Sequence, residues 1–181
     1  VSIKLPKNTA KAYEVAPILR GLVVDGCKPM VLDFRTSKQV RAFVDGTDLL
    51  RYSQLGTVTP DHVIRTKPLP LVVPVPDADN IDSFRKGATM ALKRYIRDYH
   101  AYFRRNNKIA PSRKVELDPL PRIILVPGVG LFGLGNSAKA AAIAADLAET
   151  NIAVITDAES MSHFQPISEY NLFDMEYWSL E

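Results

Sequence analysis

The stretch RIILVPGVGLFGLG, residues 122–135, decides between two folds. It opens with an apolar run over 122–126 that predicts a buried strand, and it continues into a turn rich in glycine. Gly128, Gly130 and Gly133 match the glycine spacing of dinucleotide-binding loops, and Asp157 lies where a ribose-binding acid would follow a second strand. This match makes a Rossmann-like parallel sheet one of two alternatives.

The residues between and after these glycines favour the other alternative. Within 131–135, apolar residues are interspersed with glycine, which predicts a second short strand where the dinucleotide motif requires a helix. Asn136 and Ser137 are suitable helix caps, and an apolar stripe then runs from 138 through 155 without a break. We therefore expect strand, tight turn, strand and long helix, in a three-layer α/β/α domain with a mixed sheet.

The rest of the chain fits the same architecture. Apolar spacing predicts one helix over about 10–23, with Pro17 kinking it or marking a later start, and a long helix over about 80–106. A short strand is expected over 30–34, followed by a helix capped at Thr36 or Ser37. The prolines within 69–74 favour an edge strand over a central one.

Composition narrows the class of protein. A chain of 181 residues with 46% hydrophobic residues suits a single globular α/β domain over 1–181. A net charge of +3 is too small to indicate nucleic-acid binding, and the lone Cys27 excludes an internal disulfide. No apolar run reaches membrane-spanning length and no signal peptide is recognisable, so we expect a cytoplasmic protein without a membrane partner. The absent initiator Met and the aromatic end suggest a fragment of a longer multidomain chain.

A polar cluster at 59–67 is the best candidate for chemistry. It contains Thr59, Asp61, His62, Arg65 and Lys67. A histidine beside an aspartate can transfer protons, and arginine and lysine can hold a phosphate or a carboxylate. With the turn glycines Gly128, Gly130 and Gly133, these residues would form an anion site for a phosphosugar or a nucleotide.

The competing interpretation of this cluster is structural. Thr59, Pro60 and Asp61 form the cap and first turn of a typical short helix, which explains them without chemistry. Metal binding is not expected, because His62, His100 and His163 have no metal-ligand spacing and there is no cysteine pair.

Three ordered motifs carry a resemblance to a known family. They are TPDHVIRTK at 59–67, PRIILVPGVG at 121–130 and FDMEYWSLE at 173–181. Together they resemble bifunctional rhamnulose-1-phosphate aldolase/short-chain alcohol dehydrogenase proteins, in which a class II aldolase/adducin domain comes first and a dehydrogenase domain last. The stretch similar to this chain lies between them.

The resemblance implies catalysis elsewhere in a longer protein. The family's aldolase part uses a histidine-bound divalent metal, usually zinc, and its dehydrogenase part uses NAD(P) with a Tyr-x-x-x-Lys pair. Neither set has a counterpart here, so we assign no catalytic residue, metal ligand or cofactor to this chain. It is expected to bridge the flanking aldolase and dehydrogenase domains, which are its partners, and a homo-oligomer is also compatible with this role.

A second likeness is to the closing part of a class II aldolase fold. In that comparison Val129 stands in place of a metal-binding histidine, and Asp33 and Arg35 stand in place of a His-x-His pair. The implication is a degenerate aldolase-like domain that has lost its metal, because valine cannot ligate a metal and Arg35 would repel one.

Overall fold

A computed structural model describes residues 1–26 and 28–178. Cys27 and the last three residues of the C-terminal motif lie outside this part of the chain. The elements are, in chain order, α1 (Ala12–Leu22), β1 (Val24–Asp25), β2 (Lys28–Pro29), β3 (Val31–Arg35), α2 (Lys38–Val44), α3 (Leu49–Tyr52), α4 (Pro60–Thr66), β4 (Leu71–Val72), a 3-10 helix η1 (Ala78–Asn80), α5 (Ile81–Asn107), β5 (Ile123–Val126), β6 (Gly130–Gly135), α6 (Ala138–Met161) and α7 (Glu169–Glu176).

The main sheet is mixed, with the strand order β3-β6-β5-β4. β6 pairs antiparallel with both β3 and β5, and β4 pairs parallel with β5 at the sheet edge. The predicted mixed sheet and the predicted edge strand are therefore confirmed, and the Rossmann-like parallel alternative is wrong. The physical reason is the tight turn at 127–129, which returns the chain as a hairpin instead of starting a helix.

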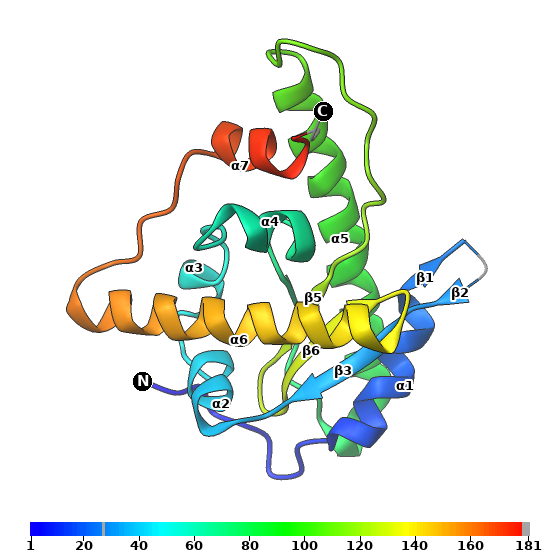
Figure 1. The fold of residues 1–181 in the computed structure, drawn as a ribbon. Coiled ribbons are helices and arrows are strands. Elements are labelled where there is room, and N and C mark those ends of the chain that lie inside the picture. The colour runs from blue at the N-terminus through cyan, green and yellow to red at the C-terminus, as the bar shows by residue number, and fades with distance from the viewer. Residues whose placement is uncertain (27, 179–181) are drawn as a thin grey trace.

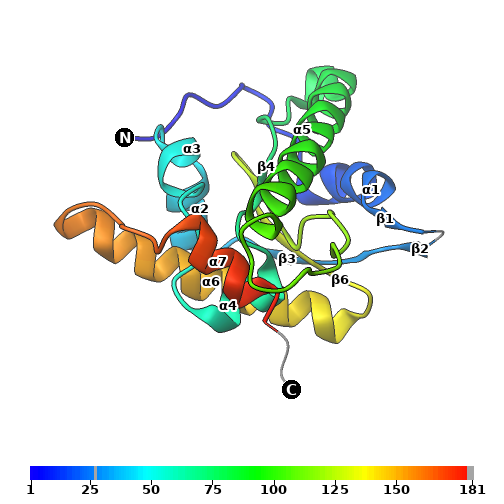
Figure 2. The same cartoon turned by 90° about the horizontal axis from the view of Figure 1, so that it is seen from above.

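Helices cover both faces of the sheet, giving the expected three layers (Figures 1 and 2). On one face, α1 and α5 close a core around Phe84, Ile124 and Phe132. On the other face, α2 and α6 close a second core that contains Leu125 and Leu131. The alternation of Ile124 and Leu125 between the two cores follows from the period of two along a strand.

The start and the length of α6 settle what the glycines do. Ser137 caps the helix by accepting a hydrogen bond from the backbone N–H of Ala140 at 3.1 Å. The helix then runs unbroken to Met161, so Asp157 is a helical residue and not the end of a second strand. A Cβ atom on Gly133 would lie 2.5 Å from the Ala141 carbonyl oxygen, so this glycine allows α6 to lie directly on β6.

Local sequence signals account for most other boundaries. α1 contains Pro17 within its span, and α2 is capped by Ser37, as expected. The long helix over 81–107 begins after Asn80, whose side chain accepts a hydrogen bond from the Ser83 N–H. Within the described ranges, no helix combines the length and the apolar character needed to cross a membrane.

Candidate functional site

The predicted cluster at 59–67 forms a helix and divides by burial. Thr59 caps α4, and its hydroxyl also lies 2.5 Å from Nδ1 of His62. His62 and Lys67 are buried, whereas Arg65 is exposed. The side chain of Asp61 lies outside what the structure describes. The structural interpretation of the helix start is therefore confirmed, and ligand binding by this cluster stays a prediction.

Lys67 ends α4 in an unusual backbone conformation. Its φ of 67° makes it the one non-glycine residue with positive φ among those described. A non-glycine residue adopts positive φ only at a cost in free energy, so surrounding contacts must hold the Lys67 backbone in this conformation. The conformation turns the lysine inward, where the side chain keeps only 6% of its accessible surface.

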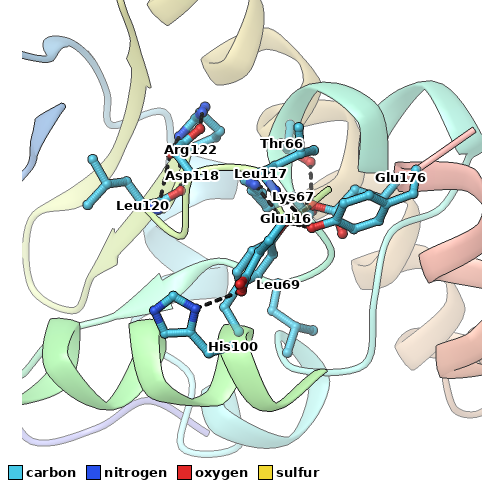
Figure 3. A network of polar contacts seen from close by, with 12 residues as sticks. Thr66, Lys67, Leu69, His100, Glu116, Leu117, Asp118, Leu120, Arg122 and Glu176 are labelled. Carbon is cyan, nitrogen blue, oxygen red and sulfur yellow. Dashed lines mark hydrogen bonds and ion pairs between the residues drawn. The ribbon is translucent and has the colours of Figure 1, made fainter. Parts of the chain in front are cut away.

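The Lys67 ammonium belongs to a buried polar network that joins three helices (Figure 3). Lys67 Nζ donates to the Tyr99 hydroxyl at 2.8 Å, and Tyr99 donates to Glu176 Oε1 at 2.7 Å. The Tyr177 hydroxyl lies 2.7 Å from that of Tyr99 and accepts from the Leu117 N–H at 3.3 Å. We call these residues, Lys67, Tyr99, Glu176 and Tyr177, the α7 clamp.

Burial shapes the ionisation of the clamp. Burial lowers the pKa of Lys67, and the charge of Glu176 only partly offsets this by raising it. Burial likewise raises the pKa of Glu176, and the charge of Lys67 only partly offsets this by lowering it. Burial also raises the pKa of Tyr177 to about 12, so this hydroxyl keeps its proton at neutral pH. The side chain of Glu176 is only 1% exposed and lies 3.4 Å from the ammonium. The clamp therefore fastens α7 to α4 and α5 from within.

A second ion pair lies beside the clamp, on the segment leading into β5 (Figure 3). The Arg122 guanidinium donates two hydrogen bonds to Asp118, one of them 3.0 Å long. Burial would raise the pKa of Asp118, but Arg122 outweighs it and holds that pKa below its usual value. Their effects on the pKa of Lys67 oppose each other, because Asp118 raises it and Arg122 lowers it.

The predicted glycine loop lies at the far end of β5 from α4 (Figure 1). The Gly128 N–H donates to the Asp45 carboxylate at 2.6 Å, so the chain's own anion occupies this amide. A Cβ on Gly130 would lie 2.3 Å from the Arg35 carbonyl oxygen, so Gly130 permits close approach of the backbone. Lys67, in contrast, shares a small cavity with Ile123, at the start of β5. The structure does not bring the α4 residues and the glycines together into one site.

The residues compared with aldolase metal ligands, Val129, Asp33 and Arg35, do not form one site either. Val129 packs in the core on the α1 and α5 side. Arg35 instead pairs with Asp33 and reaches Asp146 and Glu149 on α6, at 3.0 and 3.5 Å. Among the described residues, no three histidine, cysteine or acidic side chains cluster so that they could hold a metal ion.

Sequence reasoning placed Lys67 in the polar cluster at 59–67 but missed its partners in the clamp. Tyr99 falls within the helix predicted over about 80–106, and Glu176 and Tyr177 were only part of a motif. Two signals were present: a tyrosine within a buried stripe needs a partner for its hydroxyl, and Glu176 follows the apolar pair Leu172 and Phe173. Neither signal identifies the partner, because the bonded residues are far apart in the sequence.

Comparisons with known proteins agree with this fold. The chain is 29% identical over 180 residues to "Uncharacterized oxidoreductase YuxG" of Bacillus subtilis (strain 168). The aligned region covers 98% of this chain but only 26% of that relative. Two solved structures of YgbL, a putative aldolase/epimerase/decarboxylase, from Klebsiella pneumoniae and Escherichia coli, each superpose with a TM-score of 0.56.

These structures are 16% and 15% identical in sequence, so they show a shared fold alone. The superpositions cover 87% and 91% of this chain, and 63% and 64% of the two YgbL chains. The family model described as aldolase class II, second domain, matches residues 10–181. With nearly its whole length matched, the chain belongs to this class II aldolase family.

Proposed function

We propose that this chain is a non-catalytic, class II aldolase-like domain that bridges or assembles the catalytic parts of a longer enzyme. The observation that carries the proposal is the fate of the metal-ligand positions. Val129 is core, and Arg35 brings a fixed positive charge among three carboxylates on the opposite face of the sheet. A cation-binding site at these positions would need metal-ligating residues in place of Val129 and Arg35, with side chains that point to the same face of the sheet.

The longer enzyme, in this proposal, combines a sugar-phosphate aldolase with a short-chain dehydrogenase. The aldolase part would hold a divalent metal such as zinc, the dehydrogenase part would hold NAD(P), and both would lie outside this chain. The length of the Bacillus relative leaves room for such domains, and its name as an oxidoreductase supports the second activity. A rhamnulose-phosphate substrate and a cytoplasmic location belong to the same proposal.

An exposed apolar face on α6 supports the bridging role. Val154 and Met161 keep 42% and 83% of their accessible surface, and their spacing of seven residues places them on one side of the helix. Exposed apolar residues repeated on one helix face are typical of surfaces that contact another protein part. Flanking domains or a second copy of the protein would cover this face.

The experiment uses the full-length protein with Val154→Asp and Met161→Asp combined. We expect loss of assembly, measured by light scattering during size-exclusion chromatography, and a fall in both catalytic rates that follows the loss of assembled protein. Ser160→Asp is the matched control, because Ser160 is exposed on another side of α6 and should change neither property.

A direct catalytic or ligand-binding role makes the opposite prediction. Arg65→Gln changes an exposed residue of the predicted ligand cluster and should leave assembly and both rates intact under our proposal. A correctly assembled Arg65→Gln enzyme that lost turnover would contradict the non-catalytic role.

A further inference from the structure

The segment 85–114, which is most of α5 and the start of the loop after it, is far more basic than the rest of the chain. It holds 10 of the 23 lysine and arginine residues but only one of the 20 acidic residues, Asp98. Its net charge is +9, so the remaining residues together carry −6, which leaves the small +3 of the whole chain. The overall net charge therefore hides a strongly positive region.

Five of these cations form one line along α5. Their spacing is 7, 4, 7 and 4 residues, and at about 3.6 residues per turn each step returns to nearly the same side of the helix. From the first to the last, the line covers about 33 Å along the helix axis. All five are exposed, and we call them the α5 stripe: Lys86, Lys93, Arg97, Arg104 and Lys108.

The α5 stripe faces away from the core. The buried residues of the helix, among them Phe84, Leu92 and Tyr99, lie on the opposite side of α5 from the stripe positions. Arg97 pairs with its neighbour Asp98, in an exposed contact of 2.7 Å. The other four cations have no ion-pair partner in the part of the chain that the structure describes. Most of the positive charge is therefore not neutralised within the domain.

Protein carboxylates fit the α5 stripe better than a nucleic acid or a membrane does. The tyrosines of α5 pack inward, Tyr95 against one core and Tyr99 and Tyr102 in another, so none is placed to stack on a base. Within α5, all of which the structure describes, Met90 is the one large apolar side chain that is exposed. A single methionine leaves little to insert into a lipid surface.

A longer protein can itself supply an acidic partner. The region aligned with this chain is only 26% of the Bacillus relative, so a protein of that size carries most of its surface in other domains. A domain on the same chain meets the α5 stripe at an effective concentration on the order of millimolar, at which even a weak electrostatic contact forms. A row of Asp or Glu with matching spacing would place one carboxylate against each cation.

We propose that the α5 stripe docks on an acidic surface of another domain of the longer protein. The contact rests on the bridging role proposed above and gives that role a second surface, on the opposite face of the sheet from α6. Because the cations are exposed, the contact weakens as salt screens their charge.

The test uses carbodiimide coupling of the full-length protein, which joins a lysine amine directly to a carboxylate that it touches. Mass spectrometry of the coupled peptides then identifies the partners. We expect Lys93 and Lys108 to be joined to Asp or Glu of other domains, and the yield to fall severalfold in about 1 M salt, where the Debye length is about 3 Å. Coupling of these lysines to nothing, or only to acids of this domain, would overturn the proposal. Coupling to acids of this domain that are too distant to meet within one molecule would identify a second copy as the occupant instead.

Charge reversal locates the contact on α5. Lys86→Glu combined with Arg104→Glu reverses two stripe cations and leaves both reporter lysines in place. We expect the coupling yield to fall about fivefold, the scale of two exposed ion pairs. Lys7→Glu combined with Lys38→Glu is the matched control, because it makes the same change in net charge at exposed positions outside the stripe and should leave the yield unchanged. An equal loss in both double variants would show that the yield follows net charge, and would reject the stripe as the docking surface.

The stripe contact and the bridging role can fail separately. If Val154→Asp with Met161→Asp abolishes assembly while the stripe lysines couple to no other domain, bridging through α6 stands and the stripe contact is rejected. If the stripe lysines couple to another domain while the α6 variant assembles fully, the stripe contact stands and α6 is rejected as the bridging surface.

Discussion

The ion pair of the α7 clamp and the ion pairs around Arg35 differ in their access to water. In the α7 clamp, the side chains of Lys67 and Glu176 are 6% and 1% exposed. Around Arg35, the guanidinium is 30% exposed and its partners Asp33, Asp146 and Glu149 are 29–65% exposed. The comparison teaches that burial, more than the number of partners, decides how much a lost pair costs.

The largest effect is expected from Glu176→Ala. This change leaves the Lys67 ammonium buried without its carboxylate, which destabilises proteins by about 3–5 kcal/mol. Urea denaturation followed by circular dichroism measures the loss. Glu169→Ala, on the same helix but in the exposed pair with Arg105, is the control and should cost less than about 1 kcal/mol. Equal losses for the two variants would contradict the contrast between buried and exposed pairs.

A double variant tests whether the unpaired buried charge causes the loss of stability. Lys67→Met combined with Glu176→Leu removes both charges together and should be more stable than Glu176→Ala by about 2 kcal/mol or more, since apolar pairs often replace buried ion pairs without loss. The measurement is the same urea titration. If the double variant were as unstable as the single one, hydrogen bonding by Tyr99 and Tyr177 would have to outweigh the unpaired charge.

Arg35→Gln should have a much smaller effect. Water solvates the three carboxylates after the change, so we expect a loss of about 1 kcal/mol or less. Raising the salt concentration should shrink the difference from the unchanged protein, because screening weakens exposed pairs. A loss that is large and insensitive to salt would show that this cluster behaves like the clamp.

The smallest effect is expected at Glu159, which pairs with Arg51 at 2.6 Å. The hydrogen bond from Arg51 lowers the pKa of Glu159 from 4.5 to about 2. A lowered pKa in the folded state contributes stability above pH 4.5, and that contribution is lost as pH falls toward 2. Thermal melts across this window should show a shallower decline for Glu159→Gln. An unchanged slope would mean that the pair is solvated.

The sequence predicted the parts of the fold that rest on local patterns. The unbroken stripe at 138–155 and the capping Ser137 predict α6, and glycine interspersed with apolar residues at 131–135 predicts β6. The sequence also allowed a ligand role for Gly128, Gly130 and Gly133, which stays a prediction, and in the structure Gly133 permits the packing of α6 on β6. The same glycine spacing occurs in dinucleotide-binding loops and in strands packed closely against a helix. Only the position at which the next helix begins distinguishes the two cases.

The clamp could not be predicted in the same way. Lys67, Tyr99 and Glu176 are separated by 32 and 77 positions, and nothing local links them. Their meeting depends on how α4, α5 and α7 pack, which is a tertiary property.

The pairing of β3 with β6 has a consequence for the order of folding. Val31 lies opposite Gly135, about a hundred positions away along the chain. Closing so long a loop costs conformational entropy before any pairing rewards it, whereas α5 and α6 need only local contacts. We expect the helices and the β5–β6 hairpin to form first and the N-terminal strand to join last. The folding chain would then expose the unpaired edge of β6 until β3 pairs with it.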